Sequence, residues 1–272
     1  MSYRIDDLLY LMERLRDPQH GCPWDLEQNF QSIVPHTLEE AYEVADAIAE
    51  GDFPQLTGEL GDLLFQVVYY AQLGREEGLF DWDRVVDGIT RKLVRRHPHV
   101  FPDGNLRTPP GALSLGADQV KQRWEEIKAE ERAERSSEPE QLSLLDDVPR
   151  ALPALSRAHK LQKRASRAGF DWAEPGPVLE KIAEELDEVR GALALGRHEE
   201  VAAEIGDLLF AVVNLARHLD VDAESALRAG NEKFERRFRF IERQLASEGA
   251  EVEQTDLVRL DQLWDAAKQS GL

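Results

Sequence analysis

Apolar residues recur along most of this chain at the three- and four-residue spacing of amphipathic helices. The positions that follow this spacing include Leu8, Leu11, Met12, Leu15, Val178, Ile182, Leu186, Val189 and Leu193. Convincing segments with the strict alternation of a half-buried strand are absent. The pattern therefore predicts an all-α protein.

Proline and glycine mark where the helical pattern stops. Residues 102–116 contain a Pro-Pro pair and three glycines, which predicts a loop. A charged helix is expected over about residues 117–135. The segment 136–139 contains two serines and a proline, and the segment 149–153 begins and ends with proline, which predicts a linker.

An internal repeat organises the chain. A shift of 145 positions places residues 36–71 over residues 181–216, and 16 of the 36 aligned pairs are identical. With small gaps the likeness continues, and its later pairs are Lys92/Lys233, Arg95/Arg236, Arg96/Arg237, Trp124/Trp264 and Lys128/Lys268. We therefore expect an N-terminal domain over residues 1–135, a linker over 136–150 and a C-terminal domain over 151–272.

Five carboxylates recur in both halves, as E-E-x-x-E followed by E-x-x-D. They are Glu39, Glu40, Glu43, Glu59 and Asp62, repeated as Glu184, Glu185, Glu188, Glu204 and Asp207. Residues three and four apart share one face of a helix. An antiparallel helical hairpin that turns at Gly51 would bring Glu40 level with Asp62 and Glu43 level with Glu59. In the second copy, a turn at Gly196 would bring Glu185 level with Asp207 and Glu188 level with Glu204.

Two facing rows of carboxylates predict a site for divalent cations. All the donors are oxygens, which favours a hard ion such as Mg²⁺, with Mn²⁺ as a possible substitute. The ordinary alternative is a solvated acidic face. Like charges at helical spacing are mildly destabilising without a cation, and all five acids occur twice, so the metal site is the preferred interpretation.

Composition excludes several classes of protein. The chain has 53 acidic and 33 basic residues and a formal charge of −20, which argues against a general nucleic-acid binder. Cys22 is the only cysteine, so neither an intrachain disulfide nor a thiolate zinc cluster can form. No signal-peptide pattern and no membrane-length apolar run is found. We expect a cytoplasmic protein that binds no membrane.

The carboxylate pattern resembles the signature of the MazG family of all-α nucleoside triphosphate pyrophosphohydrolases. Three further stretches are similar to the two-domain bacterial members, namely residues 22–25, 95–101 and 231–237. The resemblance implies tandem helical domains that hydrolyse an NTP or dNTP to the monophosphate and pyrophosphate. It also implies a house-cleaning or stress-related role in control of the nucleotide pool.

Each acidic residue receives an expected role. The expected metal ligands are Glu185, Glu188, Glu204 and Asp207 in the second half, and Glu40, Glu43, Glu59 and Asp62 in the first. A carboxylate outside the metal's coordination shell could accept the proton of the attacking water. Glu184 and Glu39 are the candidates for that catalytic role.

Cations and an aromatic ring are expected to bind the nucleotide. The candidates are Lys181, Lys233, Arg236, Arg237, Trp264 and Lys268. Salt bridges with abundant glutamate, and packing of Trp264 against its own helix, are the competing interpretations. Lys181 has His36 as its counterpart, so we expect the second half to hold the main active site. The first half would then be a weaker site, a regulatory site or an assembly surface.

A two-helix hairpin cannot bury both of its faces alone. We therefore expect the domains to pair into four-helix-bundle cores, and the chain to form a homodimer.

Two alternative functions remain open, and a third is disfavoured. A ferritin-like di-iron protein would need E-x-x-H, and none of the seven histidines stands three residues after these glutamates. An acidic helical adaptor without catalysis would need no metal. A pyrophosphohydrolase dedicated to one nucleotide, such as phosphoribosyl-ATP, dUTP or dCTP, would use the same carboxylates.

Overall fold

All regular structure in the described part of the protein is helical, which confirms the predicted all-α class. The computed structural model describes residues 2–107, 109, 116, 119–120, 123–124, 126–127, 131, 143–146 and 148–272. The chain divides into two compact units, residues 1–135 and 136–272. Much of the helix expected over 117–135 and of the linker expected over 136–150 lies outside the described residues.

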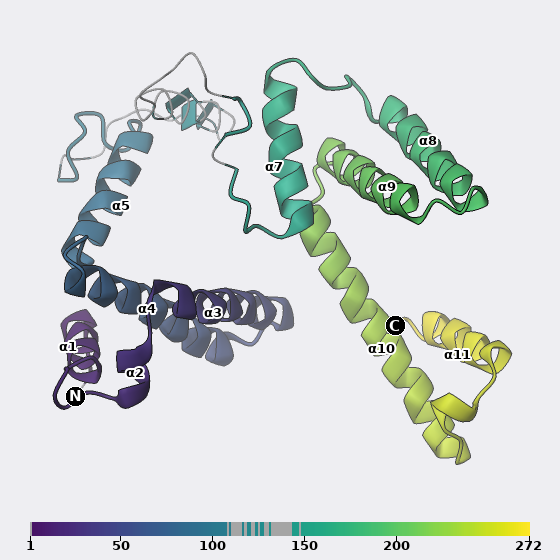
Figure 1. The fold of residues 1–272 in the computed structure, drawn as a ribbon, viewed down its shortest axis with the longest axis horizontal. Coiled ribbons are helices and arrows are strands. Elements are labelled where there is room, and N and C mark those ends of the chain that lie inside the picture. The colour runs from purple at the N-terminus through teal and green to yellow at the C-terminus, as the bar shows by residue number, and fades with distance from the viewer. Residues whose placement is uncertain are drawn as a thin grey trace. The chain divides into compact units, whose positions relative to one another are not determined.

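The first unit is built around an antiparallel hairpin of two long helices (Figure 1). Its helices are α1 (Ile5–Leu15), α2 (Pro23–Glu27), α3 (Phe30–Glu50), α4 (Phe53–Glu76) and α5 (Trp82–Arg96). The hairpin consists of α3 and α4, and both α1 and α5 contact α4.

The second unit contains the repeated hairpin. Its helices are α7 (Ala154–Arg167), α8 (Pro175–Ala194), α9 (His198–His218), α10 (Ala223–Glu248) and α11 (Leu257–Gln269), with the 3₁₀ turn η2 (Val252–Gln254) before α11. Here α8 pairs with α9, α7 packs against α9, and α10 contacts α7, α9 and α11. In Figure 1 the α8–α9 pair lies beside α7.

Local sequence explains why each hairpin turns where it does. Helix α3 ends at Glu50 and is followed by Gly51, whose φ of 72° is accessible to glycine with little strain. The side chain of Asp52 then accepts a hydrogen bond from the backbone N–H of Gln55 at 3.0 Å and caps α4. In the second unit Gly196 has a φ of 68°. The predicted stop and restart of the helices is confirmed.

Each unit has its own apolar core. In the first, the buried side chains are Met12, Ile33, Val68, Tyr69 and Leu73. In the second, the α10–α11 pair encloses Ile241, Leu245 and Leu263, with Trp264 packed against them. The first core packs α1 and α3 against α4, whereas the second lies between α10 and α11.

A large part of each hairpin's apolar surface is left exposed by the single chain. The exposed residues include Leu38, Tyr42, Ile48, Leu60, Leu64 and Val67 in the first unit, and Leu179, Leu186, Leu193, Ile205, Leu209 and Val212 in the second. Many exposed apolar side chains on one pair of helices are typical of an interaction site. None of the described helices is both long enough and apolar enough to cross a membrane.

A buried carboxylate binds the basic end of α5. The side chain of Glu131 is 3% exposed, and it accepts hydrogen bonds from Arg95 and from Arg96, whose Nη2 lies 2.5 Å from Oε2. The hydrogen bond from Arg96 has the largest effect and, together with Arg95, outweighs burial. The pKa of Glu131 therefore falls to about 2. Arg95 and Arg96, two of the three first-half counterparts of the basic residues on α10, thus form salt bridges with Glu131.

Replacing Glu131 with Gln should lower the free energy of unfolding at pH 7 by about 1–3 kcal/mol, because two charged hydrogen bonds are lost. A carboxylate whose pKa is depressed on folding stabilises the protein above its unfolded pKa of about 4.3. That contribution is lost as the pH falls from there towards about 2. Denaturant titrations at pH 7 and pH 3 should therefore show wild type and Glu131→Gln converging at the lower pH. Glu126→Gln, at an exposed pair with Arg123, is the control and should have little effect at either pH.

Candidate functional site

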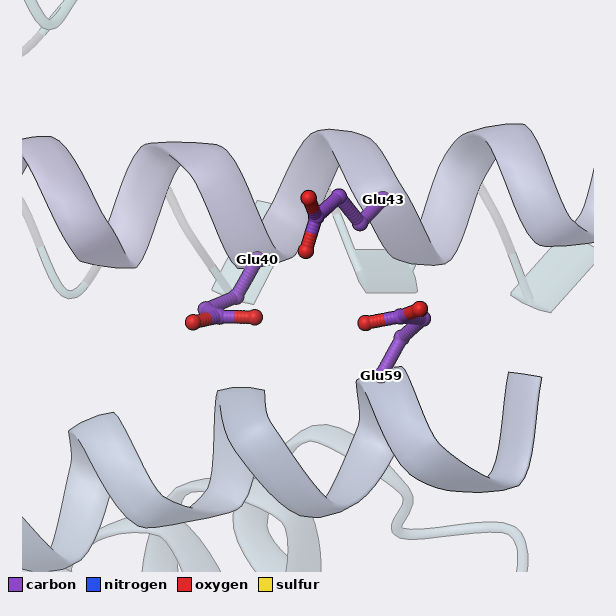
Figure 2. A group of neighbouring side chains, drawn as sticks. All are labelled: Glu40, Glu43 and Glu59. Carbon is purple, nitrogen blue, oxygen red and sulfur yellow. The ribbon is translucent and has the colours of Figure 1, made fainter. Parts of the chain in front are cut away.

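Three carboxylates meet between the helices of the first hairpin. Glu40 and Glu43 project from α3 and Glu59 projects from α4, as Figure 2 shows. One oxygen of each lies within 4.8 Å of the others. The facing of Glu43 and Glu59 is the arrangement expected from a turn at Gly51.

The second hairpin repeats this cluster with more burial. Glu185 and Glu188 of α8 and Glu204 of α9 also offer oxygens within 4.8 Å of one another. Glu185 is only 5% exposed, and its Oε2 atom is buried without a hydrogen-bond partner. A buried carboxylate oxygen without a donor is unfavourable, so a cation is the natural partner for it.

The two aspartates lie beside these clusters. The charge of Asp62 contributes to raising the pKa of Glu40, which places the two groups near each other. Asp207 lines the same pocket as Glu185. The structure therefore brings all four expected ligands of each half to one hairpin, with three of them in the tight group.

Mutual repulsion is visible in the pKa values of the clustered acids. Partial loss of hydration raises the pKa of Glu40, and the charges of Asp62 and Glu59 raise it further. Loss of hydration also raises the pKa of Glu188, followed by its hydrogen bond with Glu185 and the charges of Glu185 and Glu204. A divalent cation would relieve this repulsion.

Lys181 sits at the edge of the second cluster. Its Nζ lies 2.7 Å from Oε1 of Glu185 and 2.9 Å from Oε1 of Glu184. These contacts raise its pKa well above the ordinary lysine value, with Glu185 as the largest cause. In the first unit His36 lies 3.8 Å from Glu39 instead, so the two copies differ in local positive charge.

The two candidates for proton acceptor, Glu39 and Glu184, lie beside the clusters of carboxylates. The side chains of Glu39 and Glu184 are 64% and 58% exposed. Each is one residue before a member of the tight group, so it leaves the helix at a different angle. They lie outside the tight group, and their catalytic role stays a prediction.

The basic residues of α10 make their described contacts away from the carboxylates. Arg236 lies 3.7 Å from Glu232 on the same helix, and Lys233 is exposed. Nε of Arg237 donates to the backbone oxygen of Leu272 at 2.8 Å. Within one chain these contacts are those of a helix surface and of the α10–α11 pair.

Trp264 and Lys268 belong to the same α10–α11 pair. The ring of Trp264 lies 5.4 Å from that of Phe234, and the guanidinium of Arg237 lies 5.3 Å from it. Lys268 pairs with Asp265 at 2.6 Å. Trp124, the repeat partner of Trp264, packs edge-on against His97 at 5.0 Å. Packing accounts for both tryptophans in the single chain.

The chemistry of both clusters fits a hard divalent cation. The donors are carboxylate oxygens from two rigid helices, which suits Mg²⁺ or Mn²⁺ better than a metal that prefers sulfur or imidazole. The acidic clusters can therefore hold a metal ion, and the second offers the orphaned oxygen of Glu185 for it.

Comparison with known proteins assigns this arrangement to a family. The MazG nucleotide pyrophosphohydrolase domain matches residues 28–101 and again residues 174–239, and so covers both hairpins. The chain belongs to the MazG family. A relative in Escherichia coli K12, named nucleoside triphosphate pyrophosphohydrolase, is 53% identical to this MazG-family chain over 271 residues, which is 99% of this chain and 98% of its own.

A second MazG relative comes from Thermotoga maritima. It is named nucleoside triphosphate pyrophosphohydrolase/pyrophosphatase MazG and is 42% identical over 264 residues. The alignment covers 97% of this chain and 95% of the relative. The alignment therefore includes both units of this chain.

Sequence reasoning missed the pocket that adjoins the second cluster. Besides Glu185 and Asp207, it is lined by Gln162 of α7 and by Asn214 and Arg217 of α9. The repeat alignment held a signal for it, because Asn214 is aligned with Tyr69. At this position the second unit has a polar side chain where the first has an aromatic side chain of its core.

Replacing Glu188 with Gln should raise the melting temperature of the metal-free protein. The change removes one of several crowded negative charges, and a gain of about 1 °C or more is expected from relief of like-charge repulsion. Thermal melts in the presence of a chelator measure the effect. Glu180→Gln, on the exposed side of α8, removes the same charge away from the cluster and serves as control. A melting temperature below that of wild type would contradict the crowding.

Proposed function

We propose that this chain is a magnesium-dependent nucleoside triphosphate pyrophosphohydrolase with its main active site in the second unit. It would convert an NTP or dNTP and water to the nucleoside monophosphate and pyrophosphate. The observation that carries the proposal is the convergence of Glu185, Glu188 and Glu204 across the α8–α9 hairpin. Membership of the MazG family and the names of two full-length relatives support the reaction.

Four residues would hold the metal in the second unit, namely Glu185, Glu188, Glu204 and Asp207. When bound, Mg²⁺ neutralises phosphate charge and lowers the pKa of nearby water. Without it, the carboxylates and a triphosphate would repel each other. The acidic cluster would therefore make binding of the triphosphate dependent on a metal ion.

Two neighbouring residues would serve the reaction directly. Lys181 already lies beside Glu184 and Glu185, and its ammonium can turn from these carboxylates to a phosphate oxygen. Glu184 is the candidate for accepting the proton of the attacking water. In the balanced step, the water oxygen bonds to phosphorus, the bridge between the α- and β-phosphates breaks, and pyrophosphate leaves with the released electron pair.

Three differences support the second unit as the main site. Glu185 is buried, whereas its partner Glu40 is half-buried. Lys181 supplies a permanent positive charge where the first unit has His36. A pocket of about 730 Å³ adjoins the second cluster, which provides room for the rest of a nucleotide. The first unit would then be a weaker site, a regulatory site or an assembly surface.

The exposed apolar faces of the hairpins support a homodimer. A second copy would cover them by completing four-helix cores, since a pair of helices alone cannot bury two faces. The same contact would be able to bring the α10 residues Lys233 and Arg237, or Trp264, of one copy towards the carboxylates of the other.

Glu188→Gln should lower pyrophosphate release from NTPs and dNTPs with Mg²⁺ by about 100-fold or more, because loss of a metal ligand removes transition-state stabilisation of several kcal/mol. Glu43→Gln, at the aligned position of the first unit, should reduce turnover far less. Product analysis should find monophosphate and pyrophosphate. Glu180→Gln is the surface control.

Two results would overturn the proposal. Release of orthophosphate instead of pyrophosphate would mean that a different bond is cleaved. Full turnover by both Glu188→Gln and Glu43→Gln would remove the metal assignment and favour a non-catalytic adaptor. Rapid turnover of a single NTP or dNTP, with little turnover of the others, would show that the enzyme is dedicated to one nucleotide.

Size-exclusion chromatography with light scattering should give twice the mass of one chain. Leu209→Arg, at a half-exposed position on the outer side of α9, should shift the protein towards monomer because a buried unpaired charge is strongly unfavourable. Leu257→Arg, at an 80% exposed position on α11, is the matched control. A wild-type monomer at micromolar concentration would contradict the pairing.

A further inference from the structure

Helix α7 carries a concentration of positive charge that the proposed reaction does not use. Its sequence is ALSRAHKLQKRASR, which contains five lysine and arginine residues and one histidine but no aspartate or glutamate. Every other helix whose bounds are described contains at least one acidic residue. Such a helix is unexpected in a chain whose formal charge is −20.

The cations occupy the side of α7 opposite the pocket of the second unit. The pocket side packs against α9 (Figure 1), and from it Leu161, Gln162 and Ala165 line the pocket. At 3.6 residues per turn, the opposite sector contains only polar residues, and we call it the basic face. Its members are Ser156, Arg157, Lys160, Lys163, Arg164 and Arg167.

The middle of the basic face lacks a neutralising carboxylate. Among the described residues, none forms an ion pair with Lys160, Lys163 or Arg164. Arg164 donates instead to the backbone oxygen of Leu144 at 3.4 Å. Burial lowers the pKa of His159, and the positive charge of Lys163 lowers it further. The basic face therefore keeps its positive charge.

The helix dipole explains only part of this pattern. Arg164 and Arg167 lie in the last turn of α7, where the C-terminus of a helix stabilises cations. Lys160 and Lys163 lie before that turn. Each has like charges three or four residues away, and charges at this spacing repel each other. Without a bound anion, these two lysines therefore weaken the helix slightly.

The repeated fold does not require a basic helix at this place. In the first unit α1 packs against α4, as α7 packs against α9 in the second. Helix α1, however, carries Asp6, Asp7 and Glu13 and a single basic residue, Arg14. The same packing role is thus filled with the opposite balance of charge, so the basic face is not a consequence of that packing.

The composition of the basic face favours phosphate groups over a protein surface as its partner. Protein–protein interfaces depend on aromatic or aliphatic anchors and are depleted in lysine. The basic face offers only ammonium, guanidinium and hydroxyl groups. Groups of this kind bind the phosphates of nucleic acids without reading the bases. From Ser156 to Arg167 the face extends about 16 Å along the helix, which is enough for several phosphates.

We propose that the basic face of α7 binds a single strand of nucleic acid through its phosphodiester backbone. A flexible strand can follow one face of a helix and stay clear of nearby acids such as Asp220 and Asp222, whose charges reach His159. A duplex is stiff over about 150 base pairs, so more of its charge would lie over such acids. Charges farther away than about 8 Å are screened at physiological salt, so the net charge of the chain does not prevent this local contact.

Fluorescence anisotropy of a labelled oligouridylate of about 20 nucleotides, titrated with the full chain in EDTA, tests the proposal. The chelator removes divalent ions, so binding at the carboxylates does not contribute. Lys160→Gln/Lys163→Gln should bind about tenfold more weakly than wild type at about 50 mM salt. The slope of log Kd against log salt should also fall by about 1.4, because two phosphate contacts are lost.

Arg190→Gln/Arg197→Gln is the matched control. It removes the same charge from the second unit, but these arginines already pair with Asp187 and Glu200 at 2.8 and 3.0 Å. Its affinity should stay within about twofold of wild type. Lys160→Arg/Lys163→Arg should bind like wild type, because arginine also donates to phosphate. Wild-type melting temperatures would show that all three variants fold.

Four results would overturn the proposal. They are absence of binding by wild type, wild-type affinity in Lys160→Gln/Lys163→Gln, an equal loss in the matched control, and tighter binding of a duplex of the same length. A labelled polyglutamate peptide that binds as tightly as the oligonucleotide, and loses affinity with the same two lysines, would replace the nucleic acid with an acidic protein partner. None of these outcomes bears on the carboxylate site, which Glu188→Gln tests separately.

Discussion

Repulsion between carboxylates that face each other across a helical hairpin is the constraint on which this molecule depends. The hairpin turns at Gly51 and at Gly196, and the two helices are then close enough for their acids to share a site. Burial makes the repulsion stronger, because charges interact more strongly where water is excluded. A divalent cation would relieve this repulsion, and under the proposed function it would balance the negative charge before a triphosphate approaches.

The two copies of the hairpin have diverged around that constraint. In the second, Lys181 lies against Glu185 and partly balances its charge, and an open pocket adjoins the cluster. In the first, the aligned position is occupied by the buried Tyr69, and Arg16 pairs with Glu76 nearby. One repeated hairpin thus places Asn214 in a pocket lining in one unit and Tyr69 in an apolar core in the other.

The hairpin also divides its surface between two purposes. Its acidic side faces inward between the helices, while its apolar side remains exposed in the single chain. Covering the apolar side with a second copy would rigidify the helices that carry the carboxylates. Assembly and metal binding would then stabilise each other, because both favour the same hairpin geometry.

The sequence by itself determined the all-α class, the duplication and the facing of the acidic rows. These follow from spacings along one or two adjacent helices, which the repeat displays twice. Only the tertiary structure decided that Trp264 packs on α10, that Arg95 and Arg96 pair with Glu131, and that Gln162 and Asn214 line one pocket. Those outcomes depend on contacts between helices far apart in the chain. Local periodicity carries no information about which of several possible partners such a side chain will meet.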